Sequence, residues 1–157
     1  MSSNVSIKPP NKNWYVSLVE GEIASKSNSR KLVTQAGKPR FIKSTKARQY
    51  EERWGYFAKT RSPLFEEDVI LAVRVYYQSR RPDLDITHLK DLLQGYAYKN
   101  DRQVKMEFPV WALDREKPRV EIVVAPREDW QEVIQFLMQF DGYPYEPKRK
   151  RRKRRKK

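Results

Sequence analysis

The pattern of apolar side chains predicts at least four strands. Near residues 13–20, large apolar side chains recur at every second position, as in a strand. The stretch 68–78 (DVILAVRVYYQ) is almost continuously apolar and rich in β-branched and aromatic residues, which predicts a central strand covered on both faces. Further strands are predicted over 104–113 and 117–125, and the turn at 114–116 would pair these two as neighbours.

Apolar spacings of three and four predict three helices. The first begins at a Ser44 or Thr45 cap, carries Tyr50, Trp54 and Phe57 on one face, and ends before the Ser-Pro pair that follows. Asp85 is well placed to cap the second helix. The second and third helices are predicted at 86–93, closed by Gly95, and at 128–140, with a stripe of Trp130, Val133, Ile134, Leu137 and Met138.

A basic segment at 21–40 separates the first strand from the first helix. It contains two glycines together with Ser, Asn, Lys and Arg. Its arms, 30–34 and 40–43, can pair as a short hairpin around Gly37.

These elements together predict an α/β fold, with a mixed, largely antiparallel sheet packed with two or three helices. The domain is expected over 13–142, between a flexible N-terminal arm at 1–12 and a disordered basic C-terminal tail at 143–157. Five large aromatic residues lie on periodic apolar faces and are expected in the core, not as platforms for stacked bases. They are Trp54, Tyr56, Phe57, Trp111 and Trp130.

Charge is concentrated at the end of the chain. The net charge is +14, from 34 Lys and Arg against 20 Asp and Glu, and all ten residues of 148–157 are basic. Without them the balance is 24 against 20, or +4, so the charge of the domain does not by itself predict nucleic-acid binding. The basic tail is compatible with two roles: it could raise nonspecific DNA affinity at low salt, or it could act as a nuclear-localisation-type signal.

The remaining composition narrows the chemistry. The chain has no cysteine, which excludes disulfides and thiolate metal sites and favours an intracellular location, cytoplasmic or nucleoid-associated. The single histidine, His88, gives little support to zinc chemistry and is expected to be a packing or surface residue. No apolar run approaches the roughly 18 residues that span a bilayer, so we expect a soluble protein without membrane contact.

Two carboxylates follow the predicted central strand directly. Pro82 ends the hydrogen-bond ladder, and Asp83 and Asp85 come next, at a spacing that points both side chains the same way on extended backbone. Their repulsion is offset by a hard cation such as Mg²⁺ or Mn²⁺, which takes oxygen ligands. Helix capping and turn formation also account for an isolated pair of this kind. Asp101 supplies a third carboxylate if the helix at 86–93 turns the chain back past the first two.

The order of these motifs resembles the RusA family of Holliday-junction resolvases. Members typically show a PDxDN motif, a helix that ends in a DALNG-like turn, and a DDxQ motif. Asp83 and Asp85 match the first motif, and Asp101 and Gln103 match the last. The resemblance covers roughly residues 15–125.

The resemblance implies Mg²⁺-dependent cleavage of branched DNA, such as a four-way junction, by a homodimer whose two sites nick strands symmetrically. It implies that Asp83, Asp85 and Asp101 are catalytic and bind one or two ions of Mg²⁺, or of Mn²⁺ in its place. Such ions orient the scissile phosphate and lower the pKa of an attacking water. A catalytic lysine of the family corresponds to Lys90 here, or its position falls on Thr87 if the shorter segment is aligned directly after Asp85.

Basic side chains in two places are expected to contact DNA. One group lies in the early basic segment, and the other directly precedes the PDLD motif. Their spacing suits contacts to phosphate oxygens, which position DNA without reading its sequence, while a solvated loop is the alternative. The candidate DNA-binding residues are Lys26, Asn28, Arg30, Lys31, Arg40, Lys43, Arg80 and Arg81.

Two other functions are compatible with the same residues. A noncatalytic nucleic-acid-binding module would use the basic residues for binding, while its aspartates only cap turns. An adaptor protein would use an aromatic surface for a partner and the tail to reach RNA or an acidic protein. Cleavage of a four-way junction in the presence of Mg²⁺ separates the nuclease from both.

Overall fold

The computed structural model describes residues 9–11, 13–25 and 30–139. The basic tail predicted at 143–157 lies outside the described residues, as does most of the N-terminal arm predicted at 1–12.

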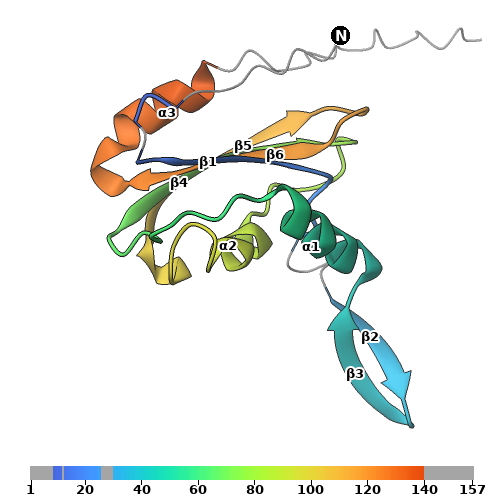
Figure 1. Ribbon diagram of the computed structural model, residues 1–157. Coiled ribbons are helices and arrows are strands. Elements are labelled where there is room, and N and C mark those ends of the chain that lie inside the picture. Colours follow the sequence, from blue (N-terminus) through green and yellow to red (C-terminus); the bar gives the residue numbers. More distant parts are fainter. Residues whose placement is uncertain (1–8, 12, 26–29, 140–157) are drawn as a thin grey trace, which may run out of the picture.

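A four-stranded mixed sheet forms the centre of the domain, in the order β1-β6-β4-β5 (Figure 1). Strand β6 pairs antiparallel with both β1 and β4, whereas β4 and β5 run parallel. The predicted α/β class and the mixed, largely antiparallel sheet are therefore confirmed. The strands are β1 (Tyr15–Glu20), β4 (Val69–Tyr77), β5 (Val104–Leu113) and β6 (Arg119–Pro126).

The predicted pairing of 104–113 with 117–125 is wrong, because β4 lies between β5 and β6. All nine residues of β4 are buried, and a strand buried in this way needs partners on both sides for its backbone groups. The N–H of Asp114 donates to the carbonyl of Tyr77 at 2.9 Å. The chain therefore passes the carboxyl end of β4 before it enters β6.

Helices cover both faces of the sheet. Helices α1 (Thr45–Phe57) and α2 (Thr87–Leu93) lie on one face, and α3 (Trp130–Met138) lies on the other (Figure 1). The Ser44 hydroxyl caps α1 by accepting the N–H of Ala47 at 3.2 Å, as predicted. Within the described residues, no helix has both the length and the apolar character needed to cross a membrane.

Strand β4 contributes to two separate apolar cores, since its side chains alternate between the faces. Leu71 and Val73 point toward the face of α1 and α2, where they join Leu89. Ile70 and Ala72 point toward the face of α3. The central strand therefore holds the three layers together.

Helix α3 is attached to the sheet by polar contacts near both of its ends. The indole N–H of Trp14 donates to Asp129 at 2.9 Å, next to the first residue of the helix. At the other end, the buried guanidinium of Arg74 donates to the carbonyl of Leu137 at 2.7 Å. Because that guanidinium also lies 3.6 Å from a carboxylate oxygen of Glu121, its buried charge is partly balanced.

The prediction that all five aromatic residues lie in the core is correct for Trp54 but wrong for Tyr56, which is 81% exposed. It is also wrong for Phe57 and Trp130, which are 42% and 40% exposed, while Trp111 is partly buried against the core beneath α1 and α2. Tyr50 and Trp54 share the face of α1 that packs on the sheet, whereas Tyr56 lies about 200° around the helix from Trp54.

The predicted hairpin around Gly37 is confirmed. It consists of β2 (Arg30–Gln35) and β3 (Lys38–Lys43), which form a two-stranded sheet of their own and extend away from the domain (Figure 1). Ala36 and Gly37 join the strands with φ values of 51° and 73°. Two consecutive positive φ values are typical of the tight turn that matches the twist of a hairpin.

The substitution Leu89→Ala tests how far the fold depends on the contact between α2 and the sheet. Leu89 is fully buried, so its truncation leaves a cavity and should lower the free energy of unfolding by about 2–5 kcal/mol, measured by urea denaturation. The control Leu18→Ala, at a position that is 40% exposed, should change it by less than about 1 kcal/mol. Equal effects of the two variants would contradict this account of the core.

Candidate active site

All three candidate aspartates lie on the connection between β4 and β5. Because these strands are parallel, the chain leaves the carboxyl end of β4 at Tyr77 and must return to the amino end of β5 at Val104. Asp83 and Asp85 lie on the first part of this connection, before α2. Asp101 begins a short 3-10 turn directly before β5. The pair and the third aspartate therefore lie near opposite ends of the connection.

Two aromatic side chains from neighbouring strands hold the loop that carries the aspartate pair. The Tyr77 hydroxyl donates to the carbonyl of Asp83 at 3.2 Å, and the indole N–H of Trp111 donates to the carbonyl of Pro82 at 3.1 Å. The two rings are stacked, with centroids 6.0 Å apart and planes inclined by 26°. The sheet thus positions the backbone from which Asp83 projects, and the Asp83 side chain is exposed.

The charges of Asp83 and Asp85 act on one point, the Tyr77 hydroxyl. Burial raises the pKa of this phenol, a hydrogen bond from the Asp85 backbone lowers it, and the carboxylates of Asp85, Glu22 and Asp83 raise it. Asp83 and Asp85 both follow the end of β4, and the Tyr77 hydroxyl contacts the backbone of Asp83.

Glu22 is a neighbour of this site that sequence reasoning missed. It follows β1, and its carboxylate accepts the backbone N–H of Gln78 at 3.0 Å and pairs with the Lys46 amine at 2.8 Å. No motif distinguishes Glu22 in the sequence. Although β6 separates β1 from β4 in the sheet, the fold brings the segment after β1 within hydrogen-bond reach of the residue that follows β4.

Asp85 was predicted to cap α2, but Ile86 occupies the cap position and makes no side-chain cap bond; instead, the Oδ1 of Asp85 accepts the N–H of Thr87, the first helical residue, at 3.0 Å. This bond satisfies one of the backbone donors that the first turn of a helix leaves unpaired. Asp85 is half-buried, in contrast to the exposed Asp83.

A capping box shapes the turn that carries Asp101. The side chain of Asn100 accepts the N–H of Arg102 at 2.9 Å, and the Gln103 side chain accepts the N–H of Asn100 at the same distance. Two backbone donors are thereby satisfied, which holds the turn in one conformation.

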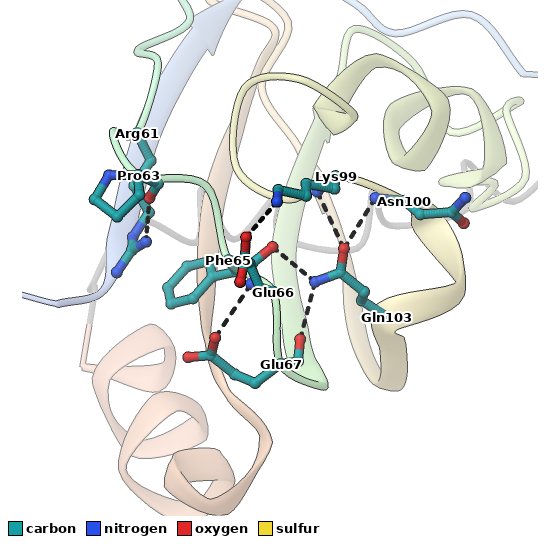
Figure 2. A network of polar contacts seen from close by, with 8 residues as sticks. All are labelled: Arg61, Pro63, Phe65, Glu66, Glu67, Lys99, Asn100 and Gln103. Carbon is teal, nitrogen blue, oxygen red and sulfur yellow. Dashed lines mark hydrogen bonds and ion pairs between the residues drawn. The ribbon is translucent and has the colours of Figure 1, made fainter.

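The amide of Gln103 fastens this turn to the segment before β4 (Figure 2). Its Nε2 donates to the carbonyl of Phe65 at 2.8 Å and to that of Glu67 at 3.0 Å, while its Oε1 also accepts the N–H of Lys99. The Lys99 amine pairs in turn with Glu66. Gln103, which matches the last family motif, thus has a positioning role in this structure.

The Tyr98 hydroxyl marks a second acidic region, around Asp101. Burial raises the pKa of this phenol, and the nearby carboxylates of Asp101, Asp91 and Glu107 raise it further. The hydroxyl donates to the carbonyl of Lys90 at 2.8 Å, which ties α2 to the segment before Asp101.

The two candidates for the family lysine differ in their surroundings. The Lys90 amine lies 2.6 Å from a carboxylate oxygen of Glu107, and both side chains are partly exposed. Thr87 is the first residue of α2 and carries no charge. Lys90 is therefore the candidate that supplies a cation, and its amine lies beside Glu107, one of the carboxylates around Asp101.

His88 packs in the protein, in agreement with its predicted role. It is 8% exposed, lies beside the ring of Tyr50, and its Nε2 has no hydrogen-bond partner among the described residues. Burial lowers the pKa of the imidazole, and the carboxylates of Glu51, Asp91 and Asp85 oppose this shift.

The three aspartates are suitable metal ligands by their chemistry, but their side chains are not grouped into a metal site. In the part of the chain that the structure describes, no three or more His, Asp or Glu side chains are grouped so as to hold a metal ion. The donors themselves fit, because the aspartates Asp83, Asp85 and Asp101 offer the carboxylate oxygens that Mg²⁺ and Mn²⁺ prefer. Their assignment as metal ligands stays a prediction.

The candidate DNA-binding residues fall into three groups. Lys26 and Asn28 lie outside the described residues. The Arg80 and Arg81 side chains are exposed on the loop directly before Pro82. The third group, on the β2–β3 hairpin, is also exposed, and consists of Arg30, Lys31, Arg40 and Lys43.

Residues 21–125 match the family model described as Endodeoxyribonuclease RusA. This match covers more than half of the chain. The chain belongs to the RusA endodeoxyribonuclease family. The resemblance inferred from the motifs is thereby confirmed, and the protein is a DNA endonuclease of the Holliday-junction resolvase type at the level of its family. A comparison with curated proteins gives no match.

The region that matches the family model includes the hairpin, α1, the central strand and the whole connection with its three aspartates.

Removal of the two hydrogen bonds to the aspartate loop should impair cleavage more than folding. The variants Tyr77→Phe and Trp111→Phe keep two stacked rings but each remove a donor to the aspartate loop, and Tyr77→Phe also removes the acceptor for the Asp85 backbone. We expect a cost of about 1 kcal/mol in unfolding free energy for each hydrogen bond lost. Misplacement of Asp83 by about 1 Å should reduce the cleavage rate by roughly 100-fold in the double variant.

Cleavage rates on a DNA junction and urea denaturation measure the two effects. The matched control is Trp130→Phe, on the other face of the sheet, which should leave the rate unchanged. A double variant with the rate of the natural protein would contradict the positioning role of these two rings.

The substitution Gln103→Glu separates the acceptor role of this side chain within the turn from its donor role toward the segment before β4. It keeps an acceptor for the N–H groups of Lys99 and Asn100 but replaces the Nε2 donor with an oxygen that faces two carbonyls. We expect a loss of about 1–3 kcal/mol in unfolding free energy, because the carbonyls of Phe65 and Glu67 lose their donor and face an oxygen instead. The exposed Gln131→Glu on α3 serves as control in the same urea titration, and an equally stable Gln103→Glu would exclude the anchoring role.

Proposed function

We propose that this protein is a Mg²⁺-dependent endodeoxyribonuclease that resolves Holliday junctions or other branched DNA by paired, symmetric nicks, with Mn²⁺ able to replace Mg²⁺. The observation that carries the proposal is the family match over residues 21–125, which includes Asp83, Asp85 and Asp101. The contacts that fasten both segments bearing these aspartates support it, because catalytic carboxylates need a fixed backbone.

Asp83, Asp85 and Asp101 are the residues that would hold the metal. When bound, Mg²⁺ supplies an acidified water as nucleophile and neutralises charge on the leaving oxygen. The chain's own contribution is to orient these groups. Tyr77 and Trp111 hold the loop of the first aspartate, and the Asp85 side chain is oriented by its bond to the first turn of α2.

Basic side chains complete the proposed site. Lys90, paired with Glu107, would meet a phosphate oxygen once Glu107 releases it or shares it. Arg80 and Arg81 precede Asp83 on an exposed loop and would bind the neighbouring phosphates. A homodimer accounts for paired nicks, since each copy carries one set of aspartates.

A noncatalytic nucleic-acid-binding module is the second candidate. It is favoured by two observations: the Asp85 carboxylate is hydrogen-bonded to the backbone at the start of α2, and the Lys90 amine is paired with Glu107. In this alternative the basic hairpin binds nucleic acid and the aspartates have structural roles alone.

Incubation with an end-labelled four-way junction and Mg²⁺ or Mn²⁺ tests the proposal. We expect symmetric nicks that disappear in EDTA, and a fall in rate of roughly 100-fold or more in both Asp83→Asn and Asp101→Asn, because each removes a charged metal ligand. The matched control is Asp68→Asn, an exposed aspartate before β4, which should cut normally. Binding without cleavage under all conditions would support the noncatalytic module, and nicks that persist in both variants would exclude the proposed ligands.

A further inference from the structure

The β2–β3 hairpin presents an apolar pair to solvent. Leu32 is 60% exposed and Phe41 is 73% exposed. They are direct cross-strand partners, so both side chains lie on the same face of the ribbon. Every residue of the two strands is exposed or half-exposed, and Figure 1 shows the hairpin extending away from the sheet. The pair is therefore not part of either apolar core.

Charge around this pair indicates the kind of partner. From residue 30 to residue 43 the hairpin carries five basic side chains and no acidic one. Such a concentration favours a polyanion, because each phosphate neutralised releases condensed counterions. An apolar partner, whether a protein or the interior of a membrane, would not require every charged residue of the hairpin to be basic. The basic residues are Arg30, Lys31, Lys38, Arg40 and Lys43.

The base of the hairpin is anchored to the domain. The Lys43 amine pairs with Glu51 of α1 at 2.8 Å, and α1 begins two residues after β3. A ribbon of six-residue strands extends about 20 Å from such an anchor. The apolar pair lies midway along it, so it can reach DNA whose backbone lies against the domain.

An aromatic ring on a basic arm has a specific use on DNA. Phosphate contacts position the arm, whereas a ring gains energy only where the face of a base is accessible. In continuous duplex, the faces are covered by neighbouring base pairs. A branch point interrupts this stacking and exposes base faces.

We propose that Phe41, supported by Leu32, stacks on bases exposed at the branch point of the DNA and so distinguishes branched DNA from plain duplex. This inference rests on the proposed function, since it names the feature that the nuclease recognises in its substrate. The basic residues of the same hairpin bind phosphates and contribute to duplex and junction affinity alike.

Binding without cleavage tests the proposal. Fluorescence anisotropy in EDTA compares a four-way junction with a linear duplex of the same sequence. Phe41→Val places another strand-forming residue at this position but removes the ring, and should weaken junction binding by about 10-fold, the loss expected for one stacked base. Its duplex affinity should change by less than about 2-fold. Phe41→Trp should restore junction affinity.

Two control variants separate the contributions. Tyr56→Val removes a ring that is 81% exposed but lies on α1, away from the hairpin, and should change neither affinity. Arg40→Ala should weaken both complexes and reduce the slope of log affinity against log salt by about one phosphate contact. A 2-aminopurine base at the branch point should change its fluorescence with the natural protein and with Phe41→Trp, but not with Phe41→Val.

The outcomes distinguish this inference from the proposed function. A natural protein that cuts and prefers the junction, with Phe41→Val equal to it, overturns the role of the hairpin alone. Equal losses on duplex and junction in Phe41→Val, or no restoration by Phe41→Trp, also overturn it. A change of oligomeric state in Phe41→Val, seen by size-exclusion chromatography, assigns the ring to a second copy of the chain and overturns it too. A natural protein without junction preference or cleavage overturns both proposals.

Discussion

The burial of β4 is the constraint on which the rest of the structure depends. A strand with both faces covered and both edges paired has no access to water for its backbone groups, so neighbours must supply every partner. Strand β6 does so from one side in the antiparallel sense, and β5 from the other in the parallel sense. The parallel pair requires a long connection across the sheet. That connection is the segment that carries α2 and the three aspartates matched by the family motifs.

The same strand explains how the candidate site is held. Tyr77 at the end of β4 and Trp111 on β5 become neighbours because the strands pair, and both donate to the backbone of the aspartate loop. At the opposite end, Gln103 fastens the turn of Asp101 to the segment that leads into β4. These hydrogen bonds form as the domain folds and hold both segments in place, while Asp83 itself stays exposed to solvent. The hairpin is different, because its apolar pair contributes to neither core and is available to a partner.

Part of the site was predictable because its signals are local. A carboxylate two residues before a helical N–H, a proline at a strand end and the order of the motifs are all visible within short windows. The placement of Asp85 at the start of α2 and the family were identified from them. The contribution of Glu22 was not predictable, because it comes from the end of β1, more than fifty residues before Tyr77. Tyr56 was wrongly assigned to the core although it lies about 200° around α1 from the buried Trp54, so strict helical periodicity would already have separated the two rings.

The sequence by itself determined the elements and the chemistry: the buried central strand, the hairpin around Gly37, the helix at α2 and the carboxylates that follow Pro82. These depend on side-chain periodicity, turn residues and backbone hydrogen bonding, which act over a few positions. The tertiary structure decided the strand order, which separates β5 from β6, and with it the placement of Asp101 at the far end of the connection from Asp83 and Asp85. Strand order depends on which surfaces must be buried together, and that competition involves the whole chain.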